Sequence, residues 1–257
     1  MREFFSRIYR GSKSEFYDDS YEALKLNKKM FVVTANPETL MIGKESDTFY
    51  DVLKSENTII VPDGIGIIKG ANYIGIPIRE RITGVEYVSY LLETLNKLCK
   101  TLYLYGASQK TLNSLVEKIK TEYPDIDLVG YIDGYNKSDE DVHRDIIKLE
   151  PDVVLVALGI PKQELFIDGV YKNVKKGIFV GVGGAFDVIS GCKKRAPEIF
   201  IKLNLEWLYR IGKEPKRIKR FYSSNIKYIK ELARLKNGGH INENKGNDCI
   251  RNKTRNN

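Results

Sequence analysis

The sequence is poor in cysteine and histidine and has no long apolar run. Its three cysteines, Cys99, Cys192 and Cys249, are scattered and odd in number, which argues against disulfides and against a zinc site. No stretch approaches the roughly eighteen apolar residues of a membrane-spanning helix. Segment 1–11 is basic and aromatic, but it lacks both a long apolar stretch and a small-residue cleavage site. We therefore expect no secretory signal and a cytoplasmic protein.

Metal-binding patterns are equally scarce. His143 and His240 are isolated, and two acidic triplets, 125–127 and 139–141, formally fit the Asp-x-Asp pattern of many sugar-nucleotide enzymes. The first triplet precedes its predicted strand instead of following it. The second lies in the predicted first turn of a helix, where acidic residues suit the helix dipole. We interpret both as structural and expect no metal site.

The net charge of +8 is unevenly distributed. Residues 192–237 hold fourteen Lys or Arg against four Asp or Glu, and residues 238–257 hold four against two. The rest of the chain is therefore mildly acidic. Such asymmetry indicates an anionic partner for the C-terminal part, such as a membrane surface, nucleic acid or phosphate.

Between residues 30 and 191, strand-like runs alternate with helical patterns. Strands are predicted at 30–34, 58–61, 101–105, 127–131, 153–158 and 177–182. Helices are predicted at 85–97, 108–123 and 138–148, the last with Ser138 as its cap and Asp141 three residues later. This alternation predicts an α/β fold: a Rossmann-like, mostly parallel sheet with helices on both faces.

Beyond residue 191 the pattern becomes that of a basic helical appendage, 192–237. One apolar helix is predicted over Ala196–Lys213, ended by Glu214-Pro215, and then apolar residues recur at helical spacing among Lys and Arg. A solvated helix face is one interpretation, but the Ile, Phe and Tyr stripe fits a membrane-surface helix better. Nucleic-acid binding has no accompanying motif. The polar tail 238–257 is expected to be disordered.

Two strands end in polar residues that can carry chemistry. Thr34 and Asn36 follow the first strand and Asp63 follows the second, and open α/β sheets bind ligands at these ends. Asp63 suits a general base for a hydroxyl nucleophile, or a cap for the helix beginning near Ile65. Thr34 and Asn36 are either substrate ligands or turn residues before a proline.

Three later strand ends are glycine-rich. Gly159 allows close backbone approach, and Lys162 and Gln163 suit an anionic or sugar group, although an ordinary loop explains them too. Segment 181–187 resembles a phosphate-cradling loop but is weak as a dinucleotide fingerprint. Gly106 opens a further phosphate or ribose loop, with a plain helix cap as the alternative.

A series of motifs carries a family resemblance. In order, residues 31–221 contain TANPET, VPDGIGI, RITG, YLYGAS, ALGIPKQE, GVGGAFDVISG, KRAP and LEWLYRIGKEPKRIKR. This series resembles the WecG/TagA/CpsF glycosyltransferase family. The resemblance implies an inverting enzyme without metal or other cofactor, which moves N-acetylmannosamine from its UDP donor to GlcNAc-diphospho-undecaprenol in a β-1,4 linkage. Wall teichoic acid, enterobacterial common antigen and capsule enzymes belong to the family.

The resemblance also implies roles for single residues. It makes Asp63 the catalytic base, Thr34 and Asn36 active-site residues and Arg81 a loop arginine of the site. For the donor side it implies a further group: Gly106, Gly159, Lys162, Gln163, Gly183, Gly184 and Asp187. Arginines of the appendage are implied to reach the diphosphate: Arg210, Arg217 and Arg220. The appendage itself is implied to dock on the inner face of the cell membrane, and family members can self-associate.

Other interpretations stay open on the residues alone. A glucosyl- or other hexosyltransferase of capsule assembly differs only in its substrates. A nucleotide-dependent oxidoreductase lacks its expected G-x-G-x-x-G after the first strand. A non-enzymatic module recruited by the basic segment is the third. Segment 1–29 departs from the family, because it is shorter, charged and rich in Tyr and Phe where a strand pair and an aliphatic helix are usual.

Overall fold

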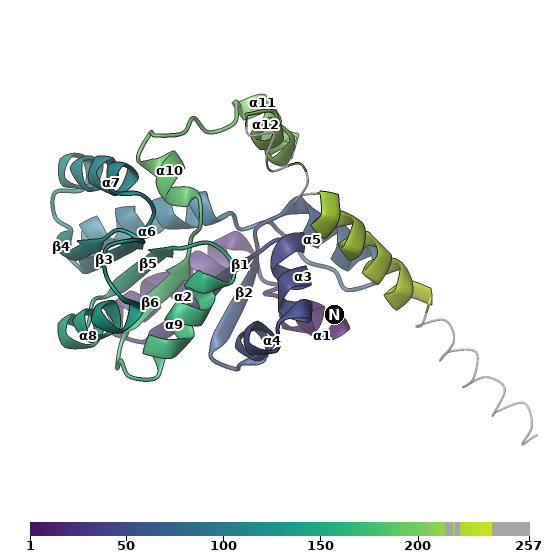
Figure 1. Cartoon of the computed structure of the whole chain (residues 1–257), viewed down its shortest axis with the longest axis horizontal. Coiled ribbons are helices and arrows are strands. Elements are labelled where there is room, and N and C mark those ends of the chain that lie inside the picture. The colour runs from purple at the N-terminus through teal and green to yellow at the C-terminus, as the bar shows by residue number, and fades with distance from the viewer. Residues whose placement is uncertain (204, 214–217, 219–221, 238–257) are drawn as a thin grey trace, which may run out of the picture.

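The computed structural model describes residues 1–203, 205–213, 218 and 222–237 (Figure 1). Within them, six strands form one parallel sheet in the order β2-β1-β6-β5-β3-β4. Their bounds are β1 Lys29–Ala35, β2 Thr58–Pro62, β3 Thr101–Gly106, β4 Asp127–Ile132, β5 Val153–Ala157 and β6 Gly177–Gly181. All six predicted strands are confirmed, and with them the α/β fold class.

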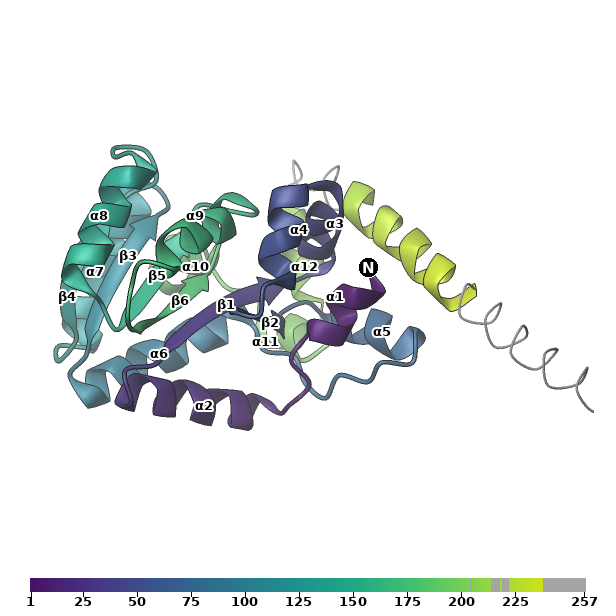
Figure 2. The same ribbon diagram turned by 90° about the horizontal axis from the view of Figure 1, so that it is seen from below.

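Helices cover both faces of this sheet (Figure 2). They are α1 Arg2–Arg7, α2 Lys13–Lys25, α3 Pro37–Glu45, α4 Asp47–Lys54, α5 Ile65–Tyr73, α6 Gly84–Leu98, α7 Gln109–Glu122, α8 Asp139–Leu149, α9 Lys162–Tyr171, α10 Ala185–Ile189, α11 Glu198–Lys202 and α12 Glu206–Lys213, followed by a helix at 222–237. Phe31 and Val33 of β1 belong to the buried core that also holds residues of α1, α3, α4, α8 and α9. Val32 belongs to the other core, with residues of α2, α6, α7 and α10. This alternation is the two-residue period of a strand buried on both sides.

The N-terminal segment forms two helices that pack on opposite faces of the sheet. Phe4 and Phe5 of α1 are fully buried in one core, and Phe16 of α2 is buried in the other. Between these helices, Ile8 forms a parallel bridge with Ile60 of β2. The three phenylalanines of this atypical segment are therefore core residues.

The C-terminal segment differs from the prediction of one helix over 196–213. Helix α11 ends at Lys202, and the backbone N–H of Leu205 donates to the Phe200 carbonyl at 2.7 Å. Such a bond from five residues ahead closes a helix end. The single-helix prediction is therefore wrong, and the apolar residues lie on two short helices. The predicted break at Glu214-Pro215 lies outside the described residues.

The helix at 222–237 is seated on α5 (Figure 1, yellow-green). Tyr228 and Leu232 are buried, and the Tyr228 hydroxyl donates to the Gly66 carbonyl at 3.0 Å. A Cβ on Gly70 would lie 2.1 Å from the Tyr228 oxygen, so the glycine is what admits the ring. Glu231 pairs with Lys44 of α3 at the edge of the contact. The appendage thus packs on the helix that directly follows the Asp63 loop.

Truncating Tyr228 tests whether its ring anchors the helix at 222–237 to α5. Tyr228→Ala is expected to lower the free energy of unfolding by about 3 kcal/mol, because it empties a filled site in the core. Tyr222→Ala on the same helix is the matched control, since Tyr222 is 62% exposed, and it should change stability by less than ~0.5 kcal/mol. Urea denaturation followed by circular dichroism measures both, and equal losses would mean that the ring is not an anchor.

Candidate active site

The first two strand ends come together at one edge of the sheet. Strands β1 and β2 are neighbours, and the Asp63 carboxylate accepts a hydrogen bond from the backbone N–H of Gly84 at 3.3 Å. A Cβ on Gly84 would contact the Thr34 side chain at 3.6 Å, and one on Gly64 would lie 3.2 Å from the Asn36 Cβ. The three residues singled out in the sequence therefore lie close together at this edge of the sheet.

The structure rules out one of the two interpretations of Asp63. Helix α5 begins after Gly64 and has no side-chain cap, so the expectation that Asp63 caps this helix is wrong. Its carboxylate instead lies at the N-terminus of the fifteen-residue α6, where the helix dipole and a backbone N–H stabilise negative charge. This geometry suits an ionised carboxylate that is only half-buried.

Thr34 and Asn36 both have structural partners. The Thr34 hydroxyl donates to the Gly181 carbonyl of β6 at 3.0 Å and so joins two strand ends. The Asn36 side chain caps α3 by accepting from the Thr39 N–H at 3.1 Å, which confirms the interpretation as a turn residue. Its Nδ2 group makes no hydrogen bond within the described residues. Asn36 can therefore cap the helix and still donate to a ligand.

Arg81 reaches this edge on the loop between α5 and α6. The neighbouring Ile82 N–H donates to the Pro62 carbonyl at 2.9 Å, which places the loop against the end of β2. Thr83 then caps α6 through the Glu86 N–H. Arg81 itself is half-buried. The R-x-x-G motif thus supplies an arginine and also the Gly84 N–H that binds Asp63.

Gln163 joins the ends of β5 and β6. Its Oε1 accepts from the Gly183 N–H at 3.0 Å and from the Gly159 N–H at 3.2 Å, and the side chain is 2% exposed. Both glycines have positive φ, +49° and +79°, which a residue with a Cβ rarely adopts. In this structure Gln163 therefore shapes the two glycine loops.

Glu164 is a buried residue of the site that the sequence interpretation missed. Its side chain is fully buried, Oε1 accepts from Gln163 Nε2 at 2.7 Å, and Oε2 has no partner within the described residues. Desolvation raises the pKa of this carboxyl to about 7. The sequence did carry a signal for this burial, because Glu164 shares a helix face with Ile167 and Tyr171, which are both buried.

Comparison with known proteins decides the family. The model of the glycosyl transferase WecG/TagA/CpsF family matches residues 4–240. The chain belongs to this family. It is 40% identical over 202 residues to the N-acetylglucosaminyldiphosphoundecaprenol N-acetyl-beta-D-mannosaminyltransferase of Bacillus spizizenii, covering 78% of this chain and 77% of that protein.

Two other relatives of the same name agree. The Bacillus subtilis protein is 39% identical over 217 residues, which is 84% of each chain. The Staphylococcus aureus protein (strain MW2) is 32% identical over 220 residues, covering 84% of this chain and 85% of the relative. The WecG/TagA/CpsF resemblance in the motifs is thus confirmed over most of the chain.

The remaining motif residues of this WecG/TagA/CpsF glycosyltransferase lie farther along the same edge. Gly106, at φ +110°, leaves no room for a Cβ, which would lie 2.5 Å from the Ala157 carbonyl oxygen. Lys162 is exposed at the start of α9, and Gly184 is exposed before α10. Asp187 accepts from the Thr111 hydroxyl and pairs with Lys193, so it ties α10 to α7 and the following loop.

The arginines expected to reach the diphosphate are not placed. Arg217 and Arg220 lie outside the described residues, and so does the side chain of Arg210, whose backbone belongs to α12. The described part of the chain holds no group of three or more His, Cys, Asp or Glu residues that could bind a metal. It also has no helix long and apolar enough to span a membrane.

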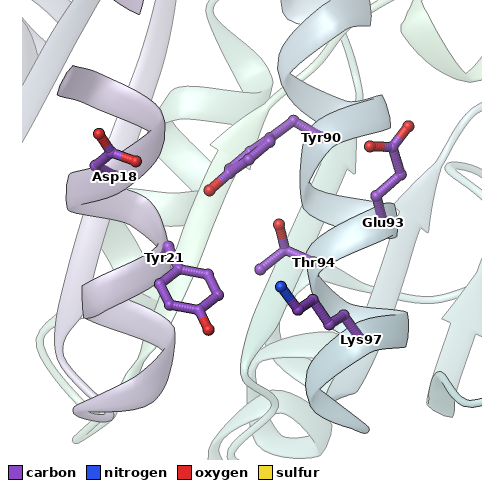
Figure 3. Close-up of a pocket in the computed structure, with 6 residues that line it drawn as sticks. All are labelled: Asp18, Tyr21, Tyr90, Glu93, Thr94 and Lys97. Atoms are coloured by element: carbon purple, nitrogen blue, oxygen red, sulfur yellow. The ribbon is translucent and has the colours of Figure 1, made fainter. Parts of the chain in front are cut away.

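A hollow of about 380 Å³ lies apart from this edge, between α2 and α6 (Figure 3). Its lining is Asp18, Tyr21, Tyr90, Glu93, Thr94 and Lys97. The nearest of these on α6, Tyr90, is six residues past Gly84, or ~9 Å along the helix axis. The ammonium groups of Lys25 and Lys97 lie over the Tyr21 ring. This hollow belongs to the contact between two helices and not to the candidate active site.

Proposed function

We propose that this protein transfers N-acetylmannosamine from UDP-N-acetylmannosamine to GlcNAc-diphospho-undecaprenol, forming a β-1,4 linkage with inversion. The observation that carries the proposal is a carboxylate, Asp63, held at the strand edge by the N-terminus of α6. The relatives named as N-acetylmannosaminyltransferases share 32–40% of their aligned residues with the chain. Teichoic acid or related cell-surface polymer synthesis is the setting this substrate implies.

The proposed reaction uses Asp63 as general base. Its carboxylate accepts the proton of the acceptor hydroxyl as that oxygen attacks the anomeric carbon, on the face opposite the departing UDP. Asn36 and Arg81 follow the ends of β1 and β2 on the same side of the sheet and would position the sugars. Inversion follows from a single displacement in which the base and the leaving group lie on opposite faces of the donor sugar.

The leaving UDP requires stabilisation of its negative charge. We propose that the Gly159 and Gly183 loops border the donor and that arginines of the appendage neutralise its diphosphate, without a metal ion. Bidentate guanidinium groups suit this task because they match the geometry of phosphate oxygens. The family resemblance implies this role for Arg210, Arg217 and Arg220.

The appendage is proposed to dock on the anionic inner surface of the cell membrane. On the helix at 222–237, Tyr222, Ile226 and Ile229 recur at a spacing of four and three residues and are 62%, 47% and 62% exposed. Basic residues flank this stripe. Other exposed apolar residues lie on α11, at its C-cap and on α12: Ile199, Leu203, Trp207 and Leu208. An apolar stripe beside Lys and Arg is typical of helices that lie in the membrane interface.

A panel of donors tests the substrate assignment. With a short-chain GlcNAc-diphospho-lipid acceptor, kcat/KM for UDP-N-acetylmannosamine should exceed that for UDP-N-acetylglucosamine or UDP-glucose at least tenfold. The reason is that a site built to hydrogen-bond one sugar leaves polar groups unpaired with another. Thin-layer chromatography of radiolabelled products provides the measurement. A preference for UDP-glucose would instead favour the hexosyltransferase of capsule assembly.

A further inference from the structure

Glu164 is a costly residue that the proposed reaction does not use. A carboxylate buried with one unpaired oxygen lowers stability, because that oxygen has lost water and gained no partner. The rise in the Glu164 pKa comes from desolvation and is opposed by the Gln163 amide and the backbone of Glu164 itself. No charged side chain contributes to it. Buried groups with a strongly shifted pKa are common at functional sites, and the hydrogen bond to Gln163 links Glu164 to the candidate site.

The two side chains fill the space above the end of β6. A Cβ on Gly181 would lie 2.7 Å from Gln163 Nε2 and 3.0 Å from Glu164 Oε1. The Gly181 carbonyl in turn accepts the hydroxyl of Thr34. A chain of contacts therefore runs from Glu164 through Gln163 to the glycine loops, at the same strand edge that carries Thr34.

The orientation of the Gln163 amide depends on Glu164. The oxygen and nitrogen of a glutamine amide are nearly equal in size, so packing alone distinguishes poorly between two orientations half a turn apart. Only one orientation presents the oxygen to the N–H groups of Gly159 and Gly183. Glu164 Oε1 selects it by accepting from Nε2 at 2.7 Å. The reversed amide would set its own N–H groups against two backbone donors.

We propose that Glu164 is a positioning residue for the donor site, which fixes the Gln163 amide so that the Gly159 and Gly183 loops stay joined beside the donor diphosphate. This inference rests on the proposed function, because it assumes that a UDP-sugar occupies those loops. It assigns to Glu164 no contact with substrate. Its effect reaches the donor through one side chain and two backbone N–H groups.

Two variants of the full chain separate positioning from a structural role. Glu164→Met removes the acceptor and the buried charge at similar volume, and should weaken UDP binding about tenfold by calorimetry and raise KM for the donor. KM for the acceptor should stay unchanged. The melting temperature at pH 8 should not fall, because loss of the buried charge and its unpaired oxygen offsets the acceptor that Gln163 Nε2 loses. Glu164→Gln keeps an acceptor oxygen and should bind UDP within about threefold of wild type. Asp168→Asn on the same helix is the control.

The outcomes are distinct. An unchanged UDP Kd in Glu164→Met, or an equal loss in Glu164→Gln, would overturn the positioning role while leaving the proposed function standing. A wild-type chain that binds no UDP would overturn the proposed function, and this inference with it. If Glu164→Met does not fold, the side-chain NH2 signals of Gln163 in wild type provide the test by NMR. They should shift as Glu164 ionises, and signals that stay constant while the Glu164 carboxyl carbon titrates would overturn the inference.

Discussion

Asp63→Asn should lower kcat by 10²- to 10⁴-fold while the protein remains folded. The asparagine keeps an oxygen that can accept from the Gly84 N–H, but it cannot take the proton of the acceptor hydroxyl. Binding of UDP should be unchanged, because the base faces the acceptor and not the donor. The loss should therefore appear in kcat for transfer to a short-chain lipid acceptor, with the donor KM within about threefold.

A matched control isolates the chemistry from charge and stability. Asp51→Asn removes an exposed carboxylate on α4 and should leave kcat unchanged. Melting temperatures of both variants should lie within a few degrees of wild type. Transfer by Asp63→Asn at more than a tenth of the wild-type rate would exclude Asp63 as the base.

Truncation after Arg195 should abolish transfer to an acceptor embedded in vesicles. It removes the proposed diphosphate arginines and the exposed apolar stripe together. It also removes Tyr228 and Leu232, which are buried against α5. Part of the loss would therefore come from disturbance of the Asp63 loop, which directly precedes α5. Full activity of the truncated chain on the lipid acceptor would show that the appendage has no part in catalysis.

A second variant keeps the helix seated and tests only its outer face. Ile226 and Ile229 are exposed, and changing both to Glu places negative charge where the membrane surface is proposed to lie. Vesicle binding by flotation should be lost, while kcat on a soluble short-chain acceptor should stay within about twofold. If binding persists and the chain instead changes its oligomeric state, the stripe is a contact between copies.

The fold was predictable because its strands carry their own signals. Runs such as Val153–Ala157 are β-branched and apolar, and helix starts at Ser108 and Ser138 are marked by their caps. Burial on both faces explains why these runs lack polar residues. The family was predictable for a different reason, since ordered motifs along most of the chain are hard to match by chance.

The site was predictable only in part, because its decisive contacts are long-range. Asp63 precedes α5 in sequence, yet its carboxylate binds the start of α6, twenty-one residues away. In the sequence, α1 lies in a charged and atypical segment, but its aromatic residues Phe4 and Phe5 are fully buried in the fold. Nothing local indicates that Glu164 lacks a partner for one oxygen, and the seat of Tyr228 requires a glycine 158 positions earlier.

One reaction tests the central claim most directly. The purified chain is incubated with UDP-N-acetylmannosamine, a GlcNAc-diphospho-lipid analogue and EDTA, and the product is examined by mass spectrometry and NMR. We predict one N-acetylmannosamine added per UDP released, in a β-1,4 linkage, at a rate that EDTA does not lower. An α-linked product, or UDP release without a glycosylated lipid, would contradict it.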